Sequence, residues 1–304
     1  MTTTRAPQTT MTTDTLASPG RRRALALLGL AAAWPWRARA QQSAGPYVPT
    51  PWKIVDEMLK LADVRADDFV MDLGSGDGRL VISAAERFGA RGYGVDIDRS
   101  LVKLANENAA RAGVAGRVRF EERDLFETSL GEATVLTLYL LPHTVTQLVP
   151  RILAEMKPGA RVVSHDYPLV PWRPDRHLQF DLAEKLYISG TTRTVLYLYT
   201  VPARVGGDWT LELPAALGPG PARLTLFQQP ERVLGTALVG EKTAVLEGLT
   251  VRGETVSFAI PGLPRRGQSA RFSGIARGDV IEGSVATPGG EAPWRATRVA
   301  AGRN

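Results

Sequence analysis

The sequence predicts an α/β fold with a mostly parallel sheet, followed by a smaller all-β domain. Between residues 69 and 164, short apolar runs alternate with amphipathic segments, which is typical of parallel strands joined by helical crossovers. After residue 207, short runs of alternating hydrophobicity recur between turns, as in an antiparallel barrel or sandwich. With 304 residues, 44% of them hydrophobic, the chain is long enough for both domains.

The α/β part is predicted to contain five parallel strands and four helices. The strands are expected at 69–73, 92–95, 118–120, 134–140 and 161–164, and the helices at 51–63, 79–88, 99–112 and 144–156. The run 134–140 is continuously apolar, which indicates a central strand buried on both faces. Segments 177–188 and 191–201 are β-rich and flank Ser189 and Gly190, so we expect an antiparallel hairpin at one edge of the sheet.

The C-terminal domain is expected to span residues 204–304, with a linker at 202–207, where the composition changes. Its predicted strands lie at 210–213, 222–228, 233–239, 243–246, 255–260, 270–275, 280–285 and 294–299. Trp209 near its start and Arg298 near its end resemble the Trp–Arg closure of lipocalin-like barrels. Residues 208–304 contain no His, Tyr, Cys or Met, so we expect the chemistry to lie in the domain formed by 41–203.

Residues 1–40 have the composition of a targeting segment. They hold six Arg and one acid, and so carry +5 of the net charge of +6. Arg21 to Arg23 precede an apolar run at 24–36 and an A-x-A site at 38–40, the order of a secretory signal. Residues 22–25 resemble a twin-arginine signal, which predicts an exported, periplasmic protein. A cytoplasmic or membrane-associated location is the alternative.

Charge and residue types exclude several classes of function. Beyond residue 40 the chain has 31 basic and 30 acidic residues, which argues against general nucleic-acid binding. There is no Cys, so disulfides and zinc-thiolate sites are excluded. The three His residues are not in a paired spacing, and we expect no metal site.

The motif that indicates chemistry is DLGSGDG at residues 72–78, which follows a predicted strand and opens a helix. Its glycines permit a sharp turn and the close approach of a ligand to the backbone. Asp96 ends the second strand and Asp124 follows the third. Because the carboxyl ends of parallel strands meet at one edge of the sheet, these acids and Asp72 should converge on one crevice. Asp96 can accept from ribose hydroxyls, and Asp124 from an adenine amine.

The same residues narrow the class of nucleotide. The dinucleotide fingerprint requires Gly where Arg79 stands, which disfavours a nicotinamide oxidoreductase. The chain has no P-loop motif, and Asp72 would repel a pyrophosphate. A nucleoside that bears a cationic sulfonium and no phosphate fits better.

Residues 69–78, together with Gly94-Val95-Asp96 and Asp124, resemble class I S-adenosylmethionine-dependent methyltransferases, which have a Rossmann-like sheet. Residues 46–51, 72–79 and 137–142 are similar to a narrower group. That group is the lysine methyltransferases of the ATP synthase c-subunit and the adenine nucleotide translocase, with their prokaryotic relatives. The resemblance covers about residues 47–201. It implies S-adenosyl-L-methionine as cofactor and the N-methylation of a protein lysine.

The resemblance also implies roles for individual residues. The cofactor would be bound by Asp72, Gly74, Ser75, Gly76, Gly78, Asp96, Ile97, Asp124 and Leu125. Tyr139 and Tyr47 are expected as walls of the acceptor channel. His143 is expected as a base or as a helix N-terminal residue, and His165 with Asp166 as groups that orient the substrate. The protein substrate could be membrane-associated, and peripheral membrane contact stays open.

Two departures from the family pattern bear on the acceptor. Residues 168–175 contain three prolines and are too short for the helix that many class I members place there. The N/D-P-P-Y signature of amide and nucleobase amino methylation is absent, and residues 140–143 read Leu-Leu-Pro-His. The alternative to an enzyme is a non-catalytic exported protein that keeps a nucleoside-binding fold and acts through its β-domain.

Overall fold

A computed structural model describes residues 47–218 and 220–300. The targeting segment predicted at 1–40 lies outside these residues, so both it and the export that it implies stay predictions. None of the described helices is long and apolar enough to cross a membrane.

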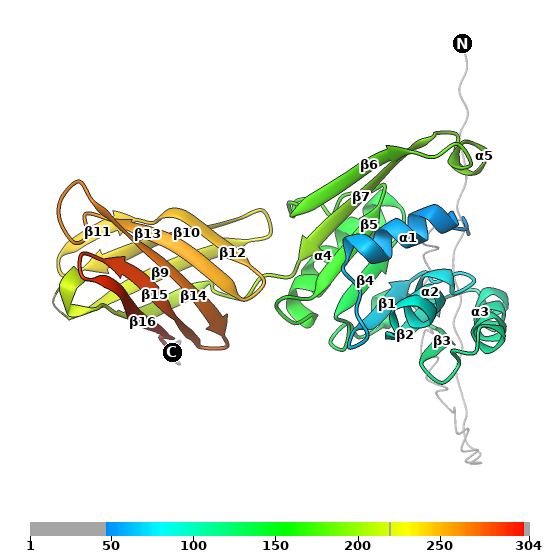
Figure 1. The fold of residues 1–304 in the computed structure, drawn as a ribbon, viewed down its shortest axis with the longest axis horizontal. Helices are drawn as coiled ribbons and strands as arrows, with labels where there is room; N and C mark the ends of the chain where they lie inside the picture. Colours follow the sequence, from blue (N-terminus) through cyan, green and yellow to red (C-terminus); the bar gives the residue numbers. More distant parts are fainter. Residues whose placement is uncertain (1–46, 219, 301–304) are drawn as a thin grey trace, which may run out of the picture. The chain divides into compact units, whose positions relative to one another are not determined.

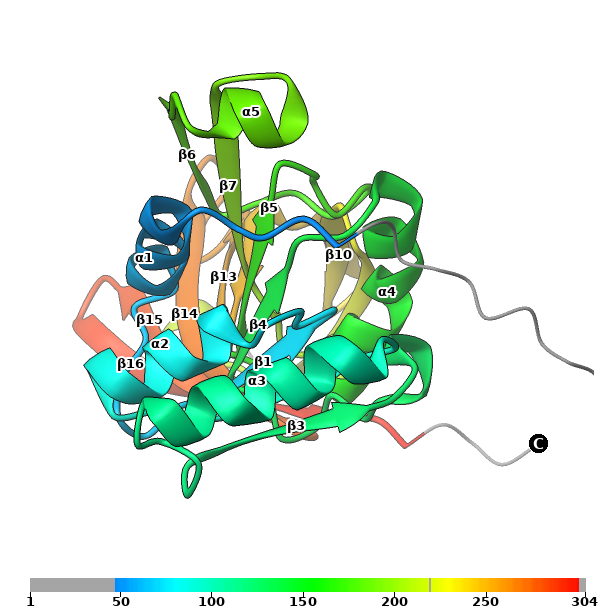
Figure 2. The ribbon, with the colours of Figure 1, turned by 90° about the vertical axis from the view of Figure 1, so that its right-hand side faces the viewer.

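The α/β part contains a seven-stranded sheet (Figures 1 and 2). Its strands, in spatial order, are β3 (Val118–Glu122), β2 (Arg91–Asp96), β1 (Phe69–Leu73), β4 (Val135–Leu138), β5 (Arg161–His165), β7 (Arg193–Thr200) and β6 (Arg176–Asp181). The first five run parallel, and β7 and β6 form the predicted antiparallel hairpin at one edge. Every residue of β4 is buried, which confirms it as the central strand. The fold is the Rossmann-like fold of methyltransferases.

Helices cover both faces of this sheet. They are α1 (Trp52–Leu61), α2 (Arg79–Phe88), α3 (Arg99–Arg111), α4 (Pro142–Glu155) and the short α5 (Lys185–Ser189). Val70 and Val135 pack in one core cluster with α1 and α2, whereas Met71 and Leu136 pack in another with α4. These neighbours alternate along β1 and β4, as the two-residue period of a strand requires. The helix α4 begins two residues before its predicted start, because Pro142 suits the first helical turn.

The predicted strand at 177–188 is only half correct. Strand β6 ends at Asp181, and residues 185–189 form the helix α5 instead. The side chain of Lys185 explains the difference. It is 1% exposed, and its Nζ donates to the Asp166 carboxylate (2.7 Å) and to the carbonyl of Arg193. This buried ion pair holds the segment in a turn of helix, and neither partner is predictable from the local pattern.

The β-domain is a nine-stranded antiparallel sheet. Its strands, in spatial order, are β11 (Lys242–Val245), β10 (Arg232–Val239), β9 (Pro221–Gln229), β8 (Gly207–Glu212), β16 (Gly290–Arg298), β15 (Val280–Thr287), β14 (Ser269–Arg277), β13 (Thr255–Pro261) and β12 (Glu247–Arg252). The two end strands are separated in sequence only by Leu246, whose amide donates to the carbonyl of Gly235 in β10 (2.9 Å). The sheet is therefore a nearly closed barrel, within the predicted class of barrel or sandwich. The strand β12 was not predicted.

Aromatic side chains fill the inside of the barrel. The rings of Phe258 and Phe272 stack at 4.9 Å, and Trp294 packs edge-on against both. The Trp209–Arg298 contact predicted from the sequence is also present, with the guanidinium 4.2 Å from the centre of the buried Trp209 ring. Arg298 also donates to Asp279 (2.8 Å) and thereby fastens the last strand of the domain to the turn before β15.

Candidate functional site

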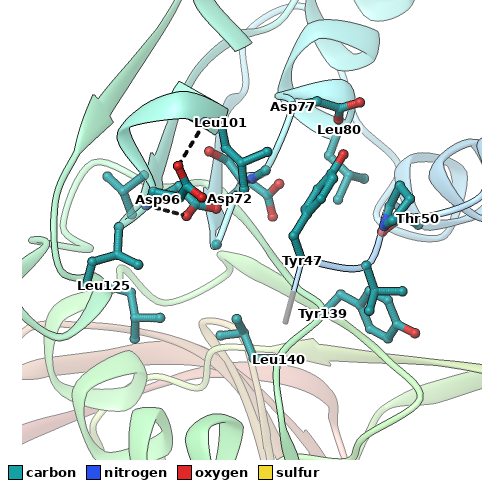
Figure 3. A pocket seen from close by; sticks show the side chains of 18 of the residues that line it. Tyr47, Thr50, Asp72, Asp77, Leu80, Asp96, Leu101, Leu125, Tyr139 and Leu140 are labelled. Atoms are coloured by element: carbon teal, nitrogen blue, oxygen red, sulfur yellow. Dashed lines mark hydrogen bonds between the residues drawn. The ribbon is translucent and has the colours of Figure 1, made fainter. Parts of the chain in front are cut away.

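One cavity of about 320 Å³ lies at the carboxyl ends of β1, β2 and β4 (Figure 3). This is where the strand order reverses, and ligands bind at such switch points in open α/β sheets. The lining comes from residues of segments 47–50, 72–80, 95–98, 123–125 and 139–141, and from Leu101 and Tyr167. Residues more than 100 positions apart in the sequence, such as Tyr47 and Tyr167, thus line the same cavity.

The turn between β1 and α2 forms the floor of this cavity. Gly76 has φ +53°, a left-handed conformation that glycine adopts without strain, and its amide donates to Asp96 Oδ2 (2.9 Å). A Cβ on Gly76 would lie 2.4 Å from Cε2 of Tyr47, so a larger residue would strain the backbone and displace the Tyr47 ring. Gly74 and Ser75 line the cavity as predicted, and both amides donate to the carbonyl of Val95. Gly78 does not line it; it precedes α2 and packs against Phe120.

Asp72 is the most unusual charge of the cavity. Its side chain is buried, and Thr137 Oγ1 donates to its Oδ1 (2.7 Å). Within the described residues no Lys, Arg or His forms an ion pair with it. Burial raises the pKa of Asp72 to about 7, the hydrogen bond from Thr137 opposes this shift, and the nearby charges of Asp96 and Asp77 add to it. A buried carboxylate without a cationic partner is suited to a cationic ligand.

The other two predicted acids reach the same cavity. Asp96 has a fixed orientation, because its two oxygens accept from the amides of Gly76 and Asp98 (2.9 and 3.0 Å). Asp124 accepts from the amide of Phe126 (2.8 Å) and begins the short 3-10 helix η1 (Leu125–Glu127). Ile97 and Leu125 lie beside them in the lining. The structure therefore brings Asp72, Asp96 and Asp124 together, as the sequence predicted.

Three tyrosines, Tyr47, Tyr139 and Tyr167, also belong to the lining. The ring of Tyr47 packs against the glycine turn, beside Gly76. Burial, and then the nearby charges of Asp166 and Tyr167, raise the pKa of Tyr139 to about 12, so its phenol stays protonated at neutral pH. Its ring centre lies 3.9 Å from that of His165.

The histidines are placed differently from the predictions. His165 does not line the cavity but lies fully buried behind Tyr139, and no described residue hydrogen-bonds either ring nitrogen. Burial lowers its pKa to about 4, so the ring is neutral at pH 7. Asp166 binds Lys185 rather than facing the cavity. His143 is exposed at the start of α4 and outside the lining, which leaves it as a helix N-terminal residue.

Arg79 has a structural part in the site that the sequence reasoning missed. Its guanidinium donates to both oxygens of Asp77 (2.9 and 2.6 Å) and to the carbonyl of Thr50 (2.6 Å), and it lies over the ring of Trp52. These contacts hold segment 47–50 along the cavity. The two-residue spacing of Asp77 and Arg79 could have indicated their ion pair, but nothing local indicates Thr50. The described part of the chain contains no cluster of His, Asp and Glu that could hold a metal ion.

Comparisons with known proteins agree with this geometry. A model described as the ANTKMT methyltransferase domain matches residues 72–176. A protein-lysine N-methyltransferase of Saccharolobus islandicus is 39% identical over 157 residues, which are 51% of this chain and 93% of the relative. The adenine nucleotide translocase lysine N-methyltransferase of mouse is 38% identical over 130 residues, 42% of this chain and 56% of that enzyme. The lysine N-methyltransferase of the ATP synthase c-subunit from Caenorhabditis elegans is 31% identical over 153 residues, 48% and 80% of the two chains.

A solved structure is also similar to the α/β part. It is an RNA methyltransferase from Salinibacter ruber in complex with S-adenosyl-L-homocysteine. The identity is 49%, the match covers 52% of this chain and 96% of that one, and the TM-score is 0.47. Each of these four matches covers about half of this chain or less.

The fold and the acid-lined cavity define a class I methyltransferase. The chain belongs to the family of S-adenosylmethionine-dependent methyltransferases that includes these protein-lysine N-methyltransferases. Its cofactor is S-adenosyl-L-methionine. The comparisons give no support to the alternative of a non-catalytic exported protein.

The residues of the cavity fit this cofactor. Among the described residues the buried carboxylate of Asp72 has no cationic partner, and the cofactor carries two cationic groups, a sulfonium and an ammonium. The hydroxyl of Ser75 is buried in the lining and has no hydrogen-bond partner in the part of the chain that the structure describes. Such an orphaned group is costly in the absence of a ligand, and a polar ligand can satisfy it.

Proposed function

We propose that this protein transfers a methyl group from S-adenosyl-L-methionine to the side-chain nitrogen of a lysine in a protein. The observation that carries the proposal is a single cavity lined by Asp72, Asp96 and Asp124 and by three tyrosines. The activity named for the relatives from Saccharolobus, mouse and Caenorhabditis supports lysine as the acceptor.

We assign the cofactor to the acid-lined side of the cavity. The residues that would hold it are Asp72, Gly74, Ser75, Gly76, Asp96, Ile97, Asp124 and Leu125. When bound, the cofactor supplies an electrophilic methyl group on its sulfonium. The backbone of the glycine turn allows close approach, Asp96 is oriented to accept from ribose hydroxyls, and Asp72 faces positive charge.

The tyrosines of the lining would receive the acceptor amine. A lysine must lose its proton before it can attack, and apolar surroundings lower its pKa. Tyr139 keeps its proton and can hydrogen-bond the amine, with the neutral ring of His165 behind it. No histidine lines the cavity, so we infer that the protein acts by positioning and desolvating the amine rather than by strong base catalysis.

The decisive test is the transfer of labelled methyl groups from S-adenosylmethionine. The full chain is incubated with cell extract, and the label is then assigned to protein, RNA or small molecules. We expect label in protein that is recovered as N-methyl-lysine after hydrolysis, and none with Asp96→Asn. Label found only in RNA or small molecules, with cofactor binding intact, would reject the lysine acceptor.

We further propose that the chain divides into its two domains near residue 203. We also propose that residues 1–40 direct export, and their positive charge and apolar run support this. Fractionation of cells with N-terminal sequencing of the mature chain tests it: a chain that keeps its N-terminus and stays in the cytoplasmic fraction would reject export.

A further inference from the structure

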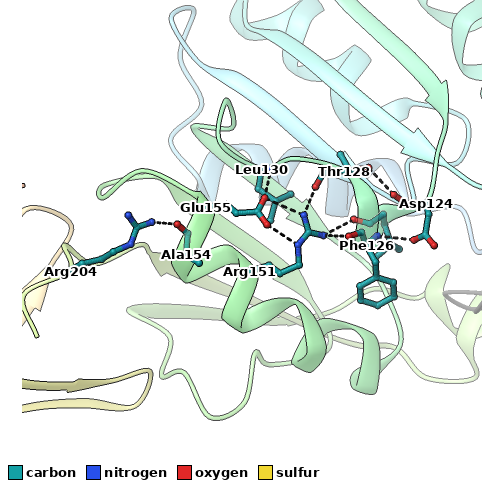
Figure 4. A network of polar contacts seen from close by, with 9 residues as sticks. Asp124, Phe126, Thr128, Leu130, Arg151, Ala154, Glu155 and Arg204 are labelled. Carbon is teal, nitrogen blue, oxygen red and sulfur yellow. Dashed lines mark hydrogen bonds and ion pairs between the residues drawn. The ribbon is translucent and has the colours of Figure 1, made fainter. Parts of the chain in front are cut away.

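The first two residues of loop 124–130 line the cavity. The backbone of this loop is held by one side chain that lies outside the cavity, that of Arg151. Asp124 and Leu125 line the cavity. Arg151 of α4 donates to the carbonyls of Leu125 (3.2 Å), Phe126 (2.6 Å) and Thr128 (2.6 Å) (Figure 4). Arg151 itself does not line the cavity.

A second residue of α4 completes this support. Glu155 accepts from Arg151 Nε (2.8 Å) and Nη2 (3.1 Å), and its Oε2 also accepts from the amide of Leu130 (3.0 Å). A guanidinium has five N–H groups, and Arg151 makes five hydrogen bonds. Both side chains are partly buried, with 26% and 32% exposed. The loop is thus fixed at several backbone atoms by one rigid, planar group.

We propose that Arg151 is a positioning residue for S-adenosylmethionine, acting through the loop that presents Asp124 and Leu125. The proposal rests on the assignment of these two residues to the cofactor. Without the guanidinium, three carbonyls lose their donor and Glu155 loses its cation. The loop would then open toward water, and Asp124 would shift from the position that binding requires. Small displacements of a binding group are costly because binding depends on its geometry.

A control for this experiment exists in a second arginine, which contacts the end of the same helix. Arg204, in the linker, also donates to three backbone carbonyls, those of Leu153 (3.1 Å), Ala154 and Met156 (3.3 Å). Figure 4 shows its contact with Ala154. These carbonyls lie at the end of α4 and none belongs to loop 124–130. Arg204→Met therefore removes the same kind of contact from the same helix without touching the loop.

The experiment measures the Kd of S-adenosylhomocysteine by calorimetry on the full chain. We expect Arg151→Met to weaken binding about 10-fold or more. Arg151→Lys should recover part of the affinity, because an ammonium replaces some donors but not the planar fork. Arg204→Met should lower the unfolding temperature and leave the Kd at the wild-type value. Circular dichroism verifies that each variant is folded, and Arg151→Lys serves if Arg151→Met is not.

A double-mutant cycle with Asp124→Asn shows whether Arg151 acts through the loop. If it does, the combined variant weakens binding by clearly less than the product of the two single effects. Multiplicative effects, or an unchanged Kd in folded Arg151→Met, would overturn the proposal. An Asp124→Asn variant that binds like wild type would also overturn it, by removing Asp124 from the cofactor site. Failure of the wild type to bind S-adenosylhomocysteine would instead reject the proposed function.

Discussion

Asp72→Asn offers the sharpest test of the cofactor site, because its effect can be worked out before any ligand is added. Burial raises the pKa of Asp72 from 3.8 to about 7. Between these pH values the folded protein holds the proton more tightly than the unfolded chain does. Its free energy of unfolding must therefore fall as the pH rises through this window. Each pH unit inside the window costs about 1.4 kcal/mol.

The variant removes this pH dependence and keeps the main hydrogen bond, because an asparagine oxygen can still accept from Thr137. Between pH 5 and pH 8 the wild type should lose about 3 kcal/mol of stability that Asp72→Asn does not lose. Any fixed cost of the buried amide cancels in this comparison. Urea unfolding of the full chain without cofactor, at pH 5, 6.5 and 8, measures the difference.

The exposed Asp67 provides the control, since Asp67→Asn should leave the wild-type pH dependence in place. The same reasoning predicts cofactor affinity. A cation beside Asp72 favours its charged form, so wild-type affinity should rise with pH up to about 7. Asp72→Asn should bind weakly at every pH. Equal pH slopes of stability in wild type and Asp72→Asn would refute the idea that a buried, unpaired carboxylate forms this part of the cavity.

Three further predictions test other parts of the structure. Gly76→Ala should weaken the binding of S-adenosylhomocysteine, because a side chain at φ +53° strains the turn and its Cβ displaces the Tyr47 ring; wild-type affinity in calorimetry would contradict this. Trp209→Ala should destabilise the β-domain by about 3–5 kcal/mol in urea unfolding, and a loss below 1 kcal/mol would contradict its role in the core. Lys185→Met should cost about 3 kcal/mol or more, because Asp166 loses its cation, and Lys185→Met with Asp166→Asn should recover part of that loss.

The local sequence pattern predicted those elements whose structure depends on residues close to one another in the chain. The bounds of β1 and α2 agree with the predicted 69–73 and 79–88, because an apolar run, a glycine turn and a helical period follow one another. The helix α5 was missed because Leu186, Tyr187 and Ile188 have strand-like side chains, whereas a buried ion pair to Asp166 decides the conformation. The strand β12 was not predicted either, and its pairing with β13 shifts register between Glu247 and Thr250.

The candidate site divides in the same way. The three acids were predictable because each follows a strand, and parallel strands end at one edge. The contacts that hold the cavity lining in place were not predictable. Arg79 reaches Thr50 across 29 positions, and Arg151 reaches the loop at 125–128 across 23 to 26 positions. These contacts depend on how α1 and α4 pack on the sheet, and no spacing in the sequence encodes them.

The position of β16 in the barrel has a consequence for synthesis. This strand pairs with β15 on one side and with β8 on the other, and Arg298 lies opposite Trp209. Without it, the sheet would separate into two groups of four strands, β8 to β11 and β12 to β15. A ribosome must therefore translate the codon for Arg298 before the barrel can close, whereas the methyltransferase sheet is complete at Thr200. Nascent chains stalled shortly after β15 should therefore contain a folded methyltransferase sheet and a β-domain that is not closed and is sensitive to protease.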